Sequence, residues 1–93
     1  ENDFAPLYHV ILFDDSEHTY EYVIEMMANL FGKSIEEGFE IAYEVDHIGQ
    51  ATIMTVGHDE AVDAQKKVIS YGPDPRMPNS KGSMGCIIEQ APR

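Results

Sequence analysis

Hydrophobic residues recur along this chain with two different periods, and each change of period marks the end of one element. Residues 7–13 (LYHVILF) form a short apolar run rich in β-branched and aromatic side chains, which predicts a buried strand. From Tyr20 to Phe31 the apolar residues return every three or four positions, which predicts one face of a helix. Thr19 is a suitable N-cap for this helix, and Gly32 is a suitable stop.

A second helix is predicted directly after the first. Ser34 and Glu37 have the spacing of a capping box, in which each side chain bonds the free backbone N–H of the other residue. Gly49 is predicted to end this helix. Its apolar residues are predicted to share one side, and they are Ile35, Phe39, Ala42 and Val45.

The remaining segments predict a strand, a helix, a loop and a last strand. Residues 51–56 (ATIMTV) read as a strand, and residues 59–71 as a helix whose acidic first turn suits the helix dipole. Residues 72–83 (GPDPRMPNSKGS) have turn chemistry without an apolar rhythm, so we expect a loop and interpret it as a solvated connector. Residues 84–89 return to strand character.

The resulting order β-α-α-β-α-β predicts an α+β fold. We expect a single sandwich, in which a three-stranded antiparallel sheet carries the helices on one face. A chain of 93 residues is too short to divide between two cores. The expected organisation is therefore a tail over residues 1–6 and one domain over residues 7–91.

Composition excludes several classes of partner. Seventeen acidic residues against six basic ones give a net charge of -11, which disfavours nucleic acid and anionic membranes and favours a cationic ligand. There is no apolar run of about 18 residues and no basic leader before an apolar segment. Cys86 is the single cysteine, which excludes an internal disulfide. These features predict a cytoplasmic protein.

An enzymatic function has little support in the sequence. The four histidines (His9, His18, His47 and His58) match no zinc-binding spacing. There is also no phosphate-binding loop and no Gly-x-Ser-x-Gly motif. We therefore expect a non-catalytic protein that needs no cofactor and no metal.

Several strings, in their order and spacing, resemble the ClpS family of adaptors of ATP-dependent Clp proteases. YHVILFDD at residues 8–15 is similar to the family's opening strand and its Asn-Asp-Asp turn. YEYVI at residues 20–24 is similar to the family's Met-Glu-Phe-Val helix start. The stretch from Val45 through Gly49 to Ala51 resembles the family's Val-His-x-x-Gly-x-Ala. The family shares its fold with the C-terminal domain of a ribosomal stalk protein, so the fold alone does not imply the function.

The resemblance implies a monomeric adaptor of the N-end rule. Such an adaptor binds an N-degron, which is a free α-amino group plus a bulky hydrophobic first residue, and delivers the substrate to a Clp protease. The family's amine-binding positions correspond to Asp14, Asp15 and Asp46, where Asp14 replaces the usual Asn and Asp46 the usual His. The positions of the family's side-chain pocket correspond to Leu12, His18, Tyr20, Val23, Ala42, Val45 and Met84.

Two of these pocket positions depart from the family in opposite directions. Ala42 stands where a bulkier Met is usual, which should enlarge the pocket. Tyr20 stands where a flexible Met is usual, which should fill part of that space. The resemblance also implies docking on the N-terminal domain of a Clp unfoldase through the third helix, with Glu60 and Lys66 as contacts, although Gln65 and Lys66 straddle the expected lysine.

Other interpretations stay open at this stage. Asp14 and Asp15 also fit an ordinary turn whose side chains cap the next helix. The replacements at Asp14 and Asp46 fit a regulator that docks on Clp without binding degrons. A stalk-like interaction domain is a further alternative, although only Lys66 and Lys67 supply the basic helix face that such domains use.

Overall fold

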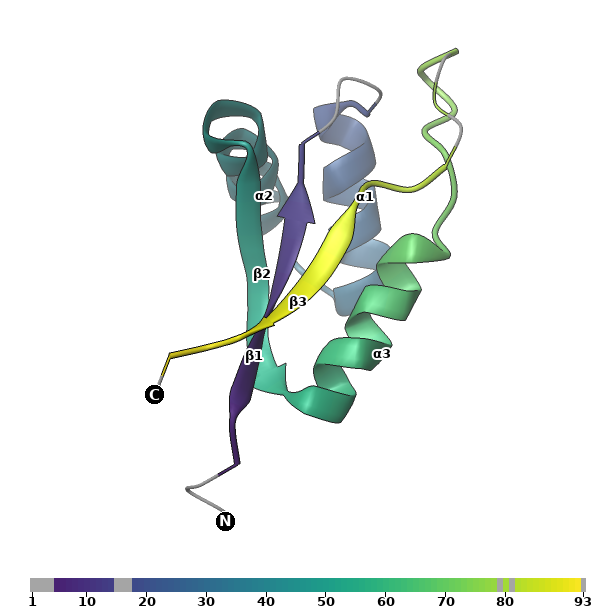
Figure 1. Ribbon diagram of the computed structural model, residues 1–93. Coiled ribbons are helices and arrows are strands. Elements are labelled where there is room, and N and C mark those ends of the chain that lie inside the picture. The colour runs from purple at the N-terminus through teal and green to yellow at the C-terminus, as the bar shows by residue number, and fades with distance from the viewer. Residues whose placement is uncertain (1–4, 15–17, 79, 81, 93) are drawn as a thin grey trace.

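A three-stranded antiparallel sheet carries the helices on one face, as the sequence predicts (Figure 1). The computed structural model describes residues 5–14, 18–78, 80 and 82–92. The strands are β1 (Leu7–Phe13), β2 (Gln50–Gly57) and β3 (Cys86–Gln90). Their order is β2-β1-β3, so the first strand lies in the centre and pairs with both neighbours.

The helices are α1 (Tyr20–Phe31), α2 (Ile35–Ile48) and α3 (His58–Ile69), which confirms the predicted order β-α-α-β-α-β. Two boundaries differ from the prediction. The last helix ends at Ile69, and Tyr71 follows in a turn that its backbone N–H closes on the Val68 carbonyl at 3.1 Å. The last strand begins at Cys86, where pairing with Leu12 starts, although Met84 is already buried.

Short-range capping bonds define the helix ends that the sequence predicts. Thr19 Oγ1 accepts from the Tyr22 amide at 3.1 Å. In the capping box, Glu37 N–H donates to Ser34 Oγ at 3.1 Å and Ser34 N–H donates to Glu37 Oε1 at 2.9 Å. Hydrogen bonding by Ser34, first of all from its backbone N–H, lowers the pKa of the Glu37 carboxyl. Gly49 ends α2 with a φ of 103°, a left-handed conformation that favours glycine.

The core lies between the sheet and the helices, and a glycine sets how closely α1 and α2 approach. A Cβ at Gly38 would lie 3.0 Å from the Ile24 Cα. The buried stripe of α2 is accordingly Gly38, Ala42 and Val45. The prediction places Ile35 and Phe39 on the same side as Ala42 and Val45. They do not belong to the buried stripe, since they are 70% and 48% exposed. Gly38 allows the two helix backbones to lie close together, and this contact sets the width of the space between them.

No helix in the described ranges is both long and apolar enough to cross a membrane.

Candidate ligand-binding site between α1 and α2

A small cavity lies near the end of β1, between the start of α1 and the second half of α2. Its volume is about 40 Å³, which holds about three water molecules and is too small for an aromatic ring. Its lining residues come from β1's end, α1, α2 and the segment before β3, and they are Asp14, His18, Thr19, Tyr20, Val23, Ala42, Val45, Asp46 and Met84.

Two carboxylates, those of Asp14 and Asp46, belong to the lining, and we call them the polar end of the cavity. Asp14 directly follows β1, and Asp46 lies in the last turn of α2. Asp14 N–H donates to the Gly49 carbonyl at 2.9 Å, which ties the end of β1 to the end of α2. That bond brings two acidic side chains to one cavity, although they are 32 positions apart in the sequence. Two carboxylates facing one small space form a favourable environment for a cationic donor.

Four further lining residues are apolar, and we call them the apolar end of the cavity. Val23, Ala42, Val45 and Met84 line it, and each is less than 5% exposed. A ligand that carries a cation next to a hydrophobic group would match both ends at once.

A tyrosine bridges the cavity and links the two helices. Tyr20 Oη donates to Asp46 Oδ2 at 2.8 Å, and the Tyr20 ring centroid lies 5.5 Å from that of Phe39. Desolvation, followed by the bond to Asp46 and the charge of Asp46, raises the pKa of the Tyr20 hydroxyl. The hydroxyl is therefore protonated at neutral pH and donates to the carboxylate. In this conformation Tyr20 occupies one of the two oxygens of the Asp46 carboxylate.

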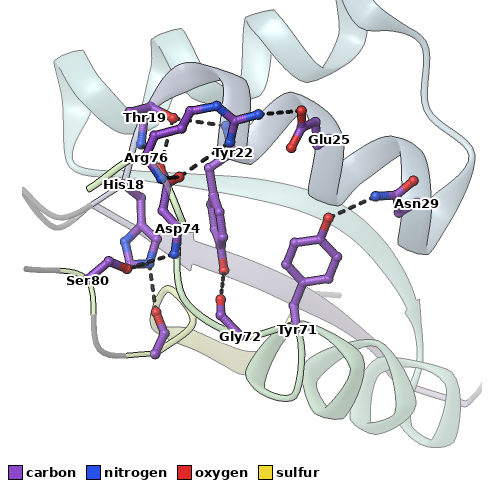
Figure 2. A network of polar contacts seen from close by, with 11 residues as sticks. His18, Thr19, Tyr22, Glu25, Asn29, Tyr71, Gly72, Asp74, Arg76 and Ser80 are labelled. Carbon is purple, nitrogen blue, oxygen red and sulfur yellow. Dashed lines mark hydrogen bonds and ion pairs between the residues drawn. The ribbon is translucent and has the colours of Figure 1, made fainter. Parts of the chain in front are cut away.

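The loop of residues 72–83 is bonded to the start of α1. The interpretation of this loop as a solvated connector holds for the exposed Pro73, Pro75 and Pro78 but is wrong for Asp74. Asp74 in the loop is only 1% exposed and accepts from both the backbone N–H and the hydroxyl of Thr19 at 2.8 Å (Figure 2). His18 Nε2 lies 2.8 Å from the Gly82 carbonyl oxygen. The loop is thus bonded to the residues that precede α1, because a buried carboxylate needs donors and Thr19 supplies two.

The structure brings most of the sequence-predicted pocket residues together. His18, Tyr20, Val23, Ala42, Val45 and Met84 all line the cavity, whereas Leu12 is fully buried in the core and does not line it. Thr19 lines the cavity and was missed, although its place beside His18 and its capping role were visible in the sequence. Asp14 and Asp46 line the polar end. Asp15 lies outside the described residues.

His47, the neighbour of Asp46, does not line the cavity. Its Nδ1 lies 2.9 Å from the Tyr43 carbonyl oxygen, and its ring stacks on Tyr43 with centroids 3.9 Å apart. Of these two neighbours, Asp46 is therefore the one that lines the cavity. Within the described residues, no three His, Cys, Asp or Glu side chains form a group that could hold a metal ion.

The two residues expected at a docking surface both lie on α3 and are exposed. Six positions separate Glu60 from Lys66, so their side chains leave the helix in directions about 120° apart. Gln65 turns inward and donates to the Cys86 carbonyl at 2.9 Å. Of the two residues that straddle the expected lysine position, Lys66 is thus the one whose side chain is exposed.

Comparisons with known proteins agree with this fold. The sequence pattern of the family described as ATP-dependent Clp protease adaptor protein ClpS matches residues 4–78. Over 63 residues the chain is 33% identical to the ATP-dependent Clp protease adapter protein ClpS of Campylobacter jejuni subsp. jejuni serotype O:23/36 (strain 81-176), covering 68% of this chain and 66% of that protein. Over 47 residues it is 38% identical to the ClpS adapter of Nautilia profundicola, covering 50% of this chain and 48% of that protein.

A solved structure has the same fold. Agrobacterium tumefaciens ClpS2 bound to L-phenylalaninamide superposes with a TM-score of 0.79, covering 94% of this chain and 99% of that chain. The two sequences are 21% identical, so this similarity supports the fold alone. The match of residues 4–78 to the family's sequence pattern decides the membership. The chain belongs to the ClpS family of adaptors of the ATP-dependent Clp protease.

Proposed function

We propose that this protein binds substrates by a free N-terminus with a bulky hydrophobic first residue and delivers them to a Clp protease. The observation that carries the proposal is the shared cavity of Asp14 and Asp46, with a buried apolar end beside them. A protein N-terminus offers an ammonium group next to a side chain. Charge-assisted hydrogen bonds to the carboxylates distinguish this ammonium from the amide of an internal residue.

The apolar end supplies affinity for the first side chain. Burying an aromatic or leucine side chain contributes about 1.5–3 kcal/mol. The ligand named for the Agrobacterium structure, L-phenylalaninamide, combines a free amino group with an aromatic side chain, which supports this assignment. By the family resemblance, Asp15 joins Asp14 and Asp46 around the ammonium group.

The cavity must open to admit such a side chain, because about 40 Å³ does not accommodate a ring. Tyr20 is the group that moves in this proposal, since its hydroxyl occupies Asp46 in the free protein. The ammonium group takes over the Asp46 oxygen when the tyrosine leaves it. Tyr20 is therefore a competitor of the ligand as well as a part of the pocket wall.

Delivery to the protease needs a second surface. We assign it to α3, with Glu60 and Lys66 as contacts for the N-terminal domain of a Clp unfoldase. The exposure of both side chains supports this assignment. The same helix would serve a regulator that docks without binding degrons, and the bond between Tyr20 and Asp46 favours that second function.

A peptide-binding experiment separates the two functions. Fluorescence anisotropy is measured with short peptides that begin with Phe, Tyr, Trp, Leu or Met, each paired with its N-acetylated twin. We expect acetylation, and separately Asp46→Ala or Asp15→Ala, to weaken binding at least tenfold, about the loss of one charge-assisted hydrogen bond. Equal binding of free and acetylated peptides would refute the amine site. If no peptide with a free N-terminus binds, the result favours the regulator that docks on Clp without binding degrons.

Removing the Tyr20 hydroxyl should strengthen binding. In Tyr20→Phe the ring remains, but Asp46 loses the hydrogen bond that competes with the ammonium group. We expect roughly three- to tenfold tighter binding of a Phe-initiated peptide, the effect of one ordinary hydrogen bond. Tyr43→Phe is the matched control, because Tyr43 is half-exposed on α2 and does not line the cavity. Weaker binding by Tyr20→Phe would show that the hydroxyl contacts the ligand instead.

A further inference from the structure

Asp74 is the only buried charged side chain in the part of the chain that the structure describes, with 1% of it exposed. It lies in the loop of residues 72–83, between two prolines, and belongs to neither a helix nor a strand. A buried carboxylate is costly unless donors surround it. Its surroundings therefore show what this loop is built to do.

Both carboxylate oxygens of Asp74 have two donors. Oδ2 accepts from the backbone N–H and the hydroxyl of Thr19, each at 2.8 Å. Oδ1 accepts from the backbone N–H of Arg76 at 2.9 Å and from its Nη1 at 3.3 Å. Burial by itself would raise the pKa of Asp74, but the bonds from Arg76 and Thr19 outweigh it and lower the pKa. Oδ2 thus links the loop to Thr19, the N-cap of α1. Oδ1 accepts from Arg76 within the loop itself.

Further bonds hold the loop along α1 (Figure 2). Arg76 Nη2 donates to Glu25 Oε2, and the Tyr22 hydroxyl donates to the Gly72 carbonyl. Within the loop, Asp74 N–H donates to Ser80 Oγ at 2.8 Å. Three sites on α1 and its cap, at Thr19, Tyr22 and Glu25, therefore bind one loop that is 50 to 55 positions away in sequence.

The same loop holds one wall of the ligand cavity. His18 Nε2 faces the Gly82 carbonyl oxygen at 2.8 Å and Ser80 Oγ at 3.3 Å, and its ring lies 4.5 Å from that of Tyr22. Thr19 is bonded to Asp74, and Met84 directly follows the loop and is 3% exposed. His18, Thr19 and Met84 all line the cavity.

We propose that Asp74 is a positioning residue for the recognition of the first side chain, because it holds the cavity wall formed by His18, Thr19 and Met84 against α1. The proposal rests on the proposed function of the cavity. A wall that is held in place before binding costs no ordering when the ligand enters, and it keeps a fixed shape. A mobile wall would bind the ligand more weakly. It would also adapt to first side chains of different shape, so that peptides with different first residues would have more similar affinities.

Asp74→Asn tests this with little change in size. An asparagine has one carboxamide oxygen, so it accepts either from Thr19 or from Arg76, and its NH₂ group faces donors at the other site. One of the two attachments is lost in either orientation. Asp63→Asn is the matched control, because it removes the same charge from an exposed site on α3 that pairs only with Lys67 across one helix turn.

Two measurements are made on each variant. Backbone ¹⁵N order parameters report the folded state alone, so they do not respond to a lower global stability. In Asp74→Asn we expect those of Thr19 and of the described non-proline loop residues, which are 74, 76, 77, 80 and 82–84, to fall from about 0.85 toward 0.6, while those of β1 and β2 stay unchanged. We also expect about tenfold weaker binding of Phe-initiated peptides, with the Phe-to-Leu affinity ratio reduced and one site per molecule retained.

The proposal is overturned if Asp74→Asn keeps both the wild-type order parameters and the wild-type ranking of peptides. It is also overturned if affinity falls while the loop stays rigid and the ranking is unchanged. Should Asp74→Asn fail to fold, Arg76→Gln removes the guanidinium bonds to Asp74 and Glu25 and leaves Thr19 bonded. In Arg76→Gln we expect lower order parameters at the same loop residues and a reduced Phe-to-Leu affinity ratio. Wild-type values of both quantities would overturn the proposal.

Failure of the proposed function has a different signature. If the wild-type protein binds no free N-terminus, the order parameters of the free protein still decide whether Asp74 holds the wall. Loosening confined to the loop and Thr19 supports the positioning role. Unchanged order parameters in Asp74→Asn overturn it.

Discussion

Replacing Asp74 by asparagine is expected to lower the free energy of unfolding at pH 7 by about 3 kcal/mol. The carboxylate is buried and accepts four hydrogen bonds, two from Thr19 and two from Arg76. Bonds to a charged group contribute about 1.5–3 kcal/mol each before coupling, and a buried group left with mismatched donors adds a penalty. Denaturant unfolding followed by circular dichroism measures the difference.

The effect should depend on pH in a defined direction. The folded-state pKa of Asp74 lies below its ordinary value of about 3.9, so the contribution of the charge to stability is complete only above about pH 5. It is lost as the pH falls through the lower pKa of the folded protein. We therefore expect the gap between wild type and Asp74→Asn to be constant from about pH 7 to pH 5 and to narrow below about pH 4.

Asp63→Asn serves again as the control. Its carboxylate forms an exposed i,i+4 pair with Lys67, which contributes little to stability. A gap that persists undiminished at pH 3 would show that the charge of Asp74 is not the source of the stabilisation.

Replacing Ala42 by methionine is expected to weaken the binding of Phe-initiated peptides by roughly 10- to 150-fold. That range is the affinity supplied by burying one large apolar side chain, about 1.5–3 kcal/mol. Ala42 is 3% exposed and lines the cavity between α1 and α2. A methionine side chain there would occupy the space that the first residue of the ligand needs.

The family resemblance sharpens this prediction, because Met is the usual residue at both the Ala42 and the Tyr20 positions. In this chain a larger residue at Tyr20 faces a smaller one at Ala42 across the same cavity. The two departures compensate in volume, so Tyr20→Met added to Ala42→Met should recover most of the lost affinity. Coupling of this kind is measured by a double-mutant cycle.

Ile48→Met is the control for introducing methionine into α2. Ile48 ends the helix, is 72% exposed and does not line the cavity. Peptide affinity should be unchanged in this variant. Unchanged affinity in Ala42→Met itself would mean that the first side chain enters elsewhere and that the assigned pocket is wrong.

Much of the fold could be predicted because its signals are local. The capping box of Ser34 and Glu37 and the stop at Gly49 act within a few residues, and the structure contains both. Burial along α2 could not be predicted in full, because hydrophobic character alone favours Phe39 for the core. The contact of Gly38 with Ile24 rotates the buried stripe by one position and leaves Phe39 half-exposed.

The site divides in the same way. The resemblance pointed to both ends of the cavity, but no sequence pattern connected Asp74 with Thr19, since 55 residues separate them. A segment rich in proline and glycine is typical of a solvated connector, and only the donors to Asp74 show that this one is also bonded to the start of α1. The Tyr20–Asp46 bond was equally invisible, because it depends on the approach of two helices.

By itself the sequence determined the order of the elements, their caps and the acidic and apolar residues available to a site, because each of these follows from neighbours along the chain. The tertiary structure decided which of these residues meet. Gly38 brings α1 and α2 together, the bond from Asp14 to Gly49 places two carboxylates at one cavity, and Asp74 holds the loop against Thr19. These contacts depend on distance in space, and a buried carboxylate finds its donors only when the chain has folded.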